Sequence, residues 1–333
     1  MIRTAIDIGT NTILMLIADF DKNKSEIKTI LDIQRIPRLG KGVDSNRNIL
    51  PESIEKAVTI LNEYKRISEE YNSEKIIAAA TSFLRDSVNR SDFIGAVKEK
   101  TGIGIEILSG EDEAKLTFIG GIYDKFRIPE SGSPVCTIDI GGGSTEISAG
   151  NTQSVWNKNT INNIRINAKS FDIGSVRIKE KFIPTHPPKT NEIKNAEEFI
   201  FSHLSQFDLA EQAGKSDLSG EALAQTDESK LIGVAGTITT LGAIKLGFDK
   251  FIPEKVDNLE MTFDDITKLL DMLSSKSLEE LYLLGNYMEG RADIIVPGTL
   301  ILKCFMEKFG FEKLTISTKG LRYGVFLREC ISS

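Results

Sequence analysis

A four-residue sequence that occurs twice constrains the fold of this chain more than any other feature. Residues Ile6–Gly9 read Ile-Asp-Ile-Gly, and the same residues return at Ile138–Gly141, 132 positions later. Each copy ends a strand-like apolar run and is followed by small polar residues and a second strand-like run. The matching context favours an internal duplication. We therefore predict two similarly built domains with a cleft between them.

Strand-like and helix-like patterns alternate along the chain, which is typical of an α/β protein. Strands are expected at residues 2–8, 13–20, 25–36, 75–80, 103–108, 135–140, 154–170, 231–234 and 314–317. Helices are expected at residues 51–72, 91–101, 109–126, 175–183, 190–206, 237–247, 263–274, 278–287, 291–308 and 320–332.

The length of 333 residues suits about two domains. We place an N-terminal α/β domain at residues 1–128 and a C-terminal α/β domain at residues 129–333, with a connector at 128–134. The closing helix, 320–332, is a candidate to pack back on the first domain. Residues 208–228 are polar and weakly patterned, so we expect a surface loop there.

Charge and composition argue against several classes of protein: nucleic-acid binders, membrane proteins and secreted proteins. The chain has 41 Lys and Arg against 48 Asp and Glu, a net charge of −7, whereas nonspecific nucleic-acid binders are basic. The longest uncharged run, Leu231–Ile244, is too short to cross a bilayer, and Asp7 interrupts what would be a signal sequence. Three widely spaced cysteines indicate buried thiols in a reducing compartment. We expect a cytoplasmic protein that binds neither nucleic acid nor membrane.

The two repeated turns, residues 7–12 and 139–146, are the first candidates for chemistry. Glycine lets backbone N–H groups approach an anion, and Thr, Asn and Ser add side-chain donors. The residues that fit phosphate binding are Gly9, Asn11 and Thr12, and then Gly141, Gly142, Gly143, Ser144 and Thr145. Asp7 and Asp139, at the strand ends, fit a divalent metal that neutralises phosphate oxygens. The alternative is two tight hairpins in which Asp caps the turn; the repetition and the glycine run favour phosphate binding.

A third glycine turn leads from a strand into a helix at Val234–Thr240. Gly236 and Thr237 would lie at the helix N-terminus, where free N–H groups and the helix dipole favour phosphate or a nucleotide. An ordinary Thr cap explains this segment equally well. The chain has no Walker A pattern, which disfavours a P-loop nucleotide fold.

Three adjacent carboxylates open the helix expected after residue 108. A capping-box spacing and the helix dipole assign Glu111 and Asp112 to helix structure. Glu113 instead shares a face with Leu116 and Gly120, and a carboxylate on an inward face is costly unless it is used or paired. The chain has only two histidines, which do not readily assemble a catalytic triad. Glu113 is therefore the candidate to orient and deprotonate water.

Two arginines complete the candidate residues. Arg85 follows a strand, where loop residues of α/β sheets commonly reach a ligand. Arg291 is expected at the start of a helix, where its charge opposes the dipole and needs an anionic partner. Asp293 and a ligand phosphate are equally good partners. Further basic candidates, most of which we expect to be solvated, are Arg38, Lys41, Arg165, Arg177, Lys319 and Arg322.

Together these residues resemble the exopolyphosphatase and guanosine pentaphosphate phosphohydrolase family, in the superfamily of actin, sugar kinases and heat-shock chaperones. Matching segments cover residues 5–16, 39–44, 80–89, 108–121, 137–147, 174–182, 234–247 and 291–301. The resemblance implies duplicated ribonuclease H-like (actin-like ATPase) domains with an interdomain active-site cleft, and a homodimer. The chain is similar to the short, two-domain members.

The resemblance also implies a reaction. It is hydrolysis of the terminal phosphoanhydride of inorganic polyphosphate, which releases orthophosphate, or alternatively of the 5′ γ-phosphate of guanosine pentaphosphate. By resemblance, Glu113 is the catalytic glutamate, Asp139 is metal-associated, and Arg85 joins the two repeated turns as phosphate-contacting positions. We hypothesise a Mg²⁺ or Mn²⁺ ion on Asp139, with Asp7 and Glu146 supporting its waters.

One segment departs from the family pattern. Relatives commonly carry Ser-Asp before the Gly-Leu-Arg of residues 320–322 and Glu after it, whereas this chain has Ser317–Lys319 and then Tyr323. Without those acids, the resemblance assigns the segment no role. Two other functions would keep the fold: an ATP-dependent kinase or ATPase, and a non-catalytic polyphosphate sensor. The intact Glu113 and Asp139 argue against the sensor.

Overall fold

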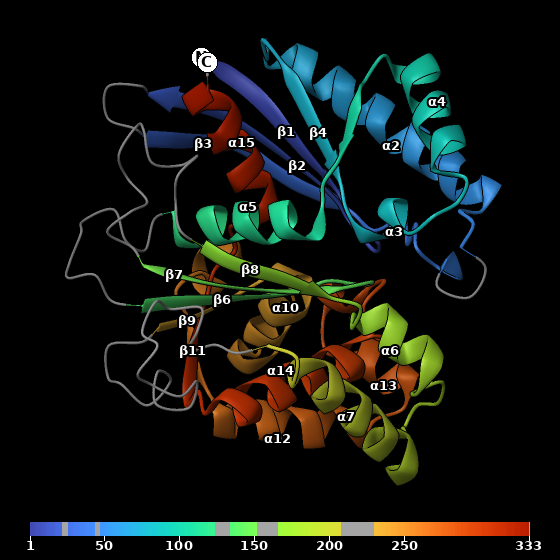
Figure 1. The fold of residues 1–333 in the computed structure, drawn as a ribbon, viewed down its shortest axis with the longest axis vertical. Helices are drawn as coiled ribbons and strands as arrows, with labels where there is room; N and C mark the ends of the chain where they lie inside the picture. Colours follow the sequence, from blue (N-terminus) through green and yellow to red (C-terminus); the bar gives the residue numbers. More distant parts are fainter. Residues whose placement is uncertain (22–25, 44–46, 124–133, 152–165, 208–229, 333) are drawn as a thin grey trace. The chain divides into compact units, whose positions relative to one another are not determined.

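The computed structural model describes residues 1–21, 26–43, 47–123, 134–151, 166–207 and 230–332. The chain forms two units, Met1–Gly120 with Leu321–Ser333 and Gly121–Gly320 (Figure 1). The predicted loop at 208–228 lies outside the described residues, as do most of the predicted connector and the first part of the strand expected at 154–170. None of the described helices has both the length and the apolar character needed to cross a bilayer.

The sheet of the first unit has the strand order β3-β2-β1-β4-β5. β1 to β3 form an antiparallel meander, and β4 and β5 add parallel strands beside β1. The strands are β1 (Ile2–Ile8), β2 (Ile13–Asp21), β3 (Glu26–Arg35), β4 (Ile76–Ala80) and β5 (Ile105–Ile107). The helices are α2 (Pro51–Glu70), α3 (Ser82–Arg85), α4 (Arg90–Thr101), α5 (Gly110–Ile122) and α15 (Leu321–Ser332).

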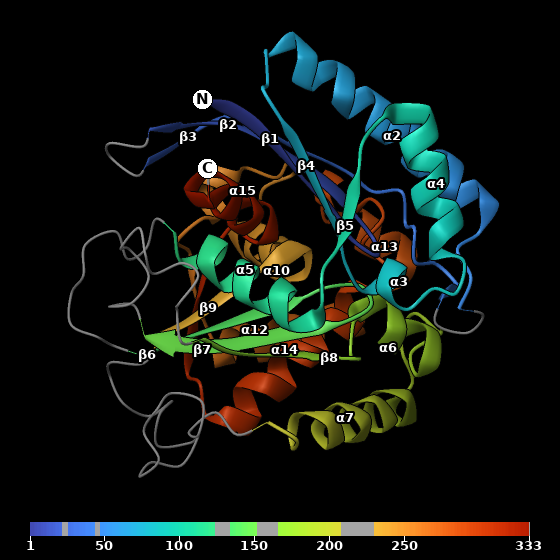
Figure 2. The ribbon, with the colours of Figure 1, turned by 45° about the horizontal axis from the view of Figure 1, so that its top comes forward.

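Alternation along β1 separates the two faces of this sheet. Ile6 and Ile8 point into a core that includes Leu61 of α2 and Val97 of α4. Asp7 lies on the opposite face, over which α15 packs, while α2 and α4 lie side by side on the first face (Figure 2). The alternation therefore places a carboxylate at the end of β1 away from the apolar core.

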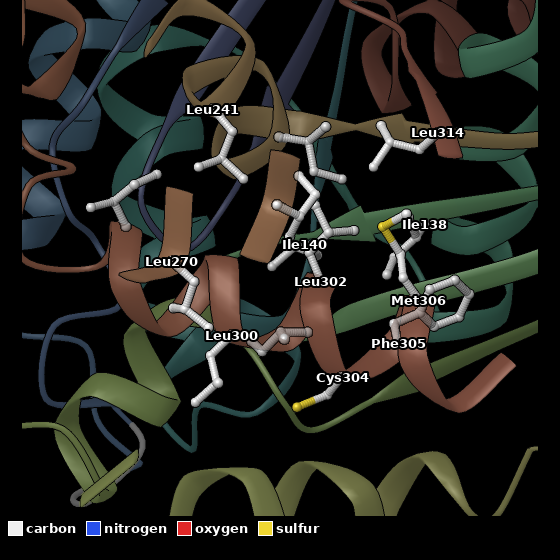
Figure 3. Packing of buried hydrophobic residues seen from close by; sticks show 14 of the residues in the cluster. Ile138, Ile140, Leu241, Leu270, Leu300, Leu302, Cys304, Phe305, Met306 and Leu314 are labelled. Carbon is white, nitrogen blue, oxygen red and sulfur yellow. The ribbon is translucent and has the colours of Figure 1, made fainter. Parts of the chain in front are cut away.

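The sheet of the second unit has the order β10-β11-β9-β6-β7-β8. Its strands are β6 (Pro134–Ile140), β7 (Thr145–Asn151), β8 (Ile166–Phe171), β9 (Lys230–Val234), β10 (Glu260–Thr262) and β11 (Lys313–Ile316). Its helices are α6 (Ser175–Lys181), α7 (Thr190–Leu204), α10 (Ala235–Leu246), α11 (Pro253–Val256), α12 (Phe263–Ser274), α13 (Leu278–Tyr282), the 3-10 helix η2 (Asn286–Met288) and α14 (Ile295–Phe309). Figure 3 shows Ile138 and Ile140 of β6 packed with Leu302 and Phe305 of α14.

The two sheets repeat one topology. β6, β7 and β8 form the same antiparallel meander as β1, β2 and β3, and β9 and β11 add parallel strands as β4 and β5 do. The predicted duplication is confirmed, and the fold is the duplicated actin-like ATPase fold. The predicted cleft is a relation between the units and stays a prediction.

Two predicted helices are present but differ from the prediction in their bounds. The helix expected at 278–287 ends at Tyr282 and cannot continue through residue 287, because Gly285 adopts a non-helical φ of 152°. The helix expected from residue 291 begins at Ile295. The N–H of Ile294 donates to the carbonyl of Arg291, which closes a tight turn before the helix. Arg291 therefore does not lie at a helix start.

Candidate active site

The first repeated turn joins β1 to β2. The N–H of Gly9 donates to the carbonyl of Thr12 at 2.9 Å. Thr10 is buried between two supports: its hydroxyl shares a hydrogen bond with Ser82 of α3 at 3.1 Å, and its carbonyl accepts from the N–H of Gly40 at 2.8 Å. A Cβ on Gly40 would overlap the Thr10 side chain. The turn is thus held in one conformation by α3 and by the loop that follows β3.

Glu113 is buried in the first turn of α5, with 6% of its surface exposed, which confirms the inward face predicted for it. Nη1 of Arg85 donates to Oε2 of Glu113 at 3.0 Å and to the carbonyl of Leu108 at 3.0 Å. One bond of the predicted capping box is confirmed, since Ser109 accepts from the N–H of Asp112 at 3.1 Å, while the Asp112 carboxylate accepts from the Ser109 hydroxyl at 2.6 Å. A carboxylate held in one orientation, as Arg85 holds Glu113, can act on a bound water.

The second repeated turn has the hydrogen bond of the first. The N–H of Gly141 donates to the carbonyl of Ser144 at 3.0 Å. A Cβ on Gly9 or on Gly141 would lie 3.1 Å from the acceptor oxygen of its own turn. Thr145 then anchors the start of β7 through a bond from Oγ1 to the carbonyl of Ile173. The two turns therefore share one backbone arrangement as well as one sequence motif.

Asp139 and Glu146 are direct partners in the pairing of β6 with β7. Side chains opposite each other in an antiparallel pair lie on one face about 5 Å apart, and two like charges there destabilise the sheet. Glu146 is buried and accepts from Oγ of Ser170 at 2.6 Å, while Asp139 is half-buried. A cation would offset the repulsion between the two carboxylates.

The donor chemistry at this pair fits Mg²⁺ or Mn²⁺. Mg²⁺ is usually held by one or two carboxylates together with waters and substrate phosphates. Within the described part of the chain, no group of three or more His, Cys, Asp or Glu side chains converges on a metal position. The facing carboxylates of Asp139 and Glu146 match this way of holding a hydrated ion.

The third glycine turn leads from β9 into α10. The N-cap residue is Val234, and Oγ1 of Thr237 donates to the carbonyl of Ile140 at 3.3 Å, so Thr237 is not the helix cap. Ala235 opens the helix with a φ of 68°, in the left-handed region that favours glycine. The turn thus contains a strained residue directly before Gly236, and such strain commonly occurs at functional sites.

Arg291 is packed against this turn. A Cβ on Gly236 would overlap its guanidinium group, and Nη1 donates to Oγ1 of Thr240 at 3.4 Å. Burial lowers the pKa of Arg291 to about 10, so the side chain stays charged at neutral pH. The carboxylate of Asp293, one of its two predicted partners, lies 3.9 Å from Nζ of Lys179.

The segment that departs from the family pattern is held by carboxylates from elsewhere in each unit. In the second unit, Asp257 accepts from the N–H of Thr318 at 2.9 Å and lies 3.7 Å from Nζ of Lys319. In the first unit, Arg322 makes a two-bond pair with Asp32 of β3, at 2.8 and 2.6 Å. Burial alone would lower the pKa of Arg322, but Asp32 raises it above its ordinary value.

The structure therefore groups the predicted residues as follows. The first unit brings Arg85 to Glu113, and the second brings Asp139 to Glu146 and Arg291 to Gly236. Ser82, Asp32 and Asp257 were missed, because each acts through a partner far away in the sequence.

This chain is similar to known proteins over nearly its whole length. A sequence profile described as the Ppx/GppA phosphatase family matches residues 16–332. A bifunctional 3-dehydroquinate synthase/phosphatase of Fusobacterium nucleatum is 32% identical over 98% of this chain, which spans 46% of that protein's length. Exopolyphosphatase 2 of Mycobacterium tuberculosis is 29% identical over 97% of both chains. The crystal structure of the Aquifex aeolicus member of the Ppx/GppA family is 28% identical, covers 100% of this chain and 98% of its own, and has a TM-score of 0.76.

Proposed function

Because this chain belongs to the Ppx/GppA phosphatase family, we propose that it is an exopolyphosphatase, which hydrolyses the terminal phosphoanhydride of inorganic polyphosphate and releases orthophosphate. The similarity to exopolyphosphatase 2 over nearly all of both chains supports this substrate. The observation that carries the chemistry is the buried Glu113 carboxylate, held by Arg85 at 3.0 Å. A positioned carboxylate of this kind is suited to general-base activation of water.

Each residue has a role in this proposal. Glu113 accepts a proton from the water that attacks the terminal phosphorus, and Arg85 fixes the orientation of the Glu113 carboxylate. The backbone N–H groups of the two repeated turns bind phosphate oxygens and stabilise the charge that develops on them. Gly236, Thr237 and Arg291 form a further phosphate-binding segment.

Asp139 and Glu146 would hold a Mg²⁺ or Mn²⁺ ion, and we assign Asp7 a supporting role toward its waters. When bound, the ion supplies positive charge that neutralises phosphate oxygens. The facing carboxylates of β6 and β7 support this assignment, since their repulsion is offset by a cation.

The test is a comparison of phosphate release from three substrates by the purified protein with Mg²⁺. Long-chain polyphosphate is expected to be the best substrate. Polyphosphate and guanosine pentaphosphate end in the same kind of bond, so both are tested. Faster phosphate release from guanosine pentaphosphate would show that it, and not polyphosphate, is the preferred substrate. Turnover of ATP without turnover of polyphosphate would indicate a kinase or ATPase, and metal-independent polyphosphate binding without any turnover would indicate a sensor.

We extend the proposal to location and assembly. The enzyme acts in the cytoplasm as a homodimer, without nucleic-acid or membrane partners. Light scattering coupled to size-exclusion chromatography tests the assembly, and a single mass near 36.8 kDa would contradict it. Salt-dependent DNA binding at physiological ionic strength would contradict the absence of a nucleic-acid partner.

A further inference from the structure

All three carbonyl groups of the glycine run in the second repeated turn are bonded to one short segment, Ser175–Arg177 at the start of α6. The N–H of Ser175 donates to Gly141 at 2.9 Å, the N–H of Val176 to Gly142 at 2.9 Å, and Nε of Arg177 to Gly143 at 2.9 Å. Additional bonds come from Oγ of Ser175 to Gly141 at 3.2 Å and from the N–H of Arg177 to Gly142 at 3.2 Å. These contacts form what we term the carbonyl clamp.

The clamp determines where the turn's donors point. A trans peptide is planar, so its N–H group is directed opposite to its carbonyl. Because the carbonyls of residues 141, 142 and 143 face α6, the N–H groups of residues 142, 143 and 144 face away from it. Three successive amides directed to one side form an anion-binding concavity.

Close packing beneath the turn shows that the clamp tolerates little displacement. A Cβ on Gly174 would overlap the carbonyl of Gly142. Arg177 supplies the side-chain donor to Gly143, and its guanidinium also lies 3.7 Å from the exposed carboxylate of Asp172. The Arg177 side chain is largely buried, so its donor is held against the turn.

We propose that Arg177 is a positioning residue for the phosphate-binding turn. Its Nε–H fixes the peptide that joins Gly143 to Ser144, and so directs the amide of Ser144 toward the terminal phosphate. Arg177 contributes a hydrogen bond to the protein's own backbone, and its charge has no direct part in binding. The inference rests on the proposed function of the turn.

Two neutral variants separate these roles. Arg177→Gln removes the charge but keeps an N–H donor. Arg177→Met removes both the charge and the donor, and its side chain is similar in size to that of Gln. The Met variant is expected to lose kcat on the order of tenfold, the scale of one hydrogen bond, with little change in KM, and the Gln variant to recover most of that loss. Equal losses in both variants, with a raised KM that depends on salt, would show that Arg177 acts by charge on the substrate.

Hydrogen exchange gives a readout that does not depend on turnover. The amides of residues 175–177, which donate to the carbonyls of Gly141 and Gly142, are expected to exchange faster in Arg177→Met than in the wild type, and Arg177→Gln is expected to stay close to wild type. Gly174→Ala should accelerate exchange in the same peptide, and Arg66→Met, at an exposed helix position, should leave it unchanged. Unchanged exchange in the Met variant would overturn the clamp. An inactive wild type with the expected exchange pattern would overturn the proposed function alone.

Discussion

Arg85 and Glu113 form a charge-assisted hydrogen bond between α3 and α5, with Nη1 3.0 Å from Oε2. Only 8% of the Glu113 side chain is exposed, against 24% of the Arg85 side chain. Arg85 also bonds the carbonyl of Leu108, so its position does not depend on Glu113 alone. Glu113 can therefore be altered while the arginine keeps one anchor.

Glu113→Gln is expected to lower the rate of phosphate release by about 10²- to 10⁴-fold, the usual contribution of a general base. The amide keeps the shape of the carboxylate but cannot accept the proton. Affinity for tripolyphosphate, measured by calorimetry, should change little. Glu111→Gln is the matched control, since Glu111 is exposed on the same helix turn and pairs with Lys115. Near wild-type turnover in the Glu113 variant would remove Glu113 from the role of base.

Asp139→Asn is expected to raise the Mg²⁺ concentration needed for half-maximal activity, because it removes one of two facing carboxylates. In the wild type, Mg²⁺ should raise the melting temperature by preferential binding to the folded state, and this increase should shrink in the variant. Glu198→Gln, at an exposed position on α7, serves as the control. An identical Mg²⁺ response in wild type and Asp139→Asn would contradict the metal assignment.

Asp32→Ala is expected to lower the free energy of unfolding by about 2–4 kcal/mol, because it leaves the buried Arg322 charge without its two-bond partner. Urea denaturation measures the change. Glu63→Ala breaks the more exposed pair with Arg35 and should cost less than about 1 kcal/mol. Similar losses in both variants would show that burial of the Arg322 pair makes no extra contribution to the free energy of unfolding.

Gly324→Ala and Gly95→Ala are expected to change stability in opposite directions. Both glycines lie inside helices, where alanine is intrinsically favoured by up to about 1 kcal/mol. A Cβ on Gly95 meets nothing within 4 Å, whereas a Cβ on Gly324 would overlap the carbonyl of Leu116 in α5. We therefore expect a gain at Gly95 and a loss of about 1–3 kcal/mol at Gly324. A gain at both sites, measured by thermal melting, would rule out close packing of α15 on α5.

The three cysteines are expected to resist thiol reagents in the native protein at pH 8. Burial raises the pKa of Cys330 to about 11 and of Cys304 to about 12, and it raises the pKa of Cys136 as well. The reactive thiolate is therefore scarce. Ellman's reagent should label all three only after denaturation.

The same shifts predict how stability depends on pH. Above an ordinary thiol pKa of about 9, the unfolded chain releases protons that the folded chain retains, so these thiols make stability fall as pH rises toward 11. Substitution of Cys330 by Ala should flatten this part of the profile. Rapid native labelling at pH 8 would contradict the burial of the thiols.

Features encoded by neighbouring residues were predictable from the sequence. The duplicated Ile-Asp-Ile-Gly turns, the strand alternation on β1 and the Ser109 cap before Glu113 each depend on residues within a few positions of one another. Burial of Glu113 followed from its helix face alone.

Features that join distant residues were not predictable. Arg322 and Asp32 lie 290 positions apart, and the sequence around either residue does not identify the other as its partner. Arg177 is 34 positions from Gly143, and only the fold brings its Nε to that carbonyl. The start of α14 was misplaced because the turn at Arg291 and Ile294 depends on single backbone bonds that hydrophobic periodicity does not resolve.

The discontinuous first unit has a consequence for biosynthesis. Its five strands emerge from the ribosome within the first 120 residues, but α15 follows only after another 200 residues have been made. At roughly 5–20 residues per second, Arg322 is synthesised on the order of 15–60 s after Asp32, which lies 290 positions earlier. The continuous second unit can complete its own sheet during that interval. The N-terminal sheet is thus the first to be translated and the last to be closed.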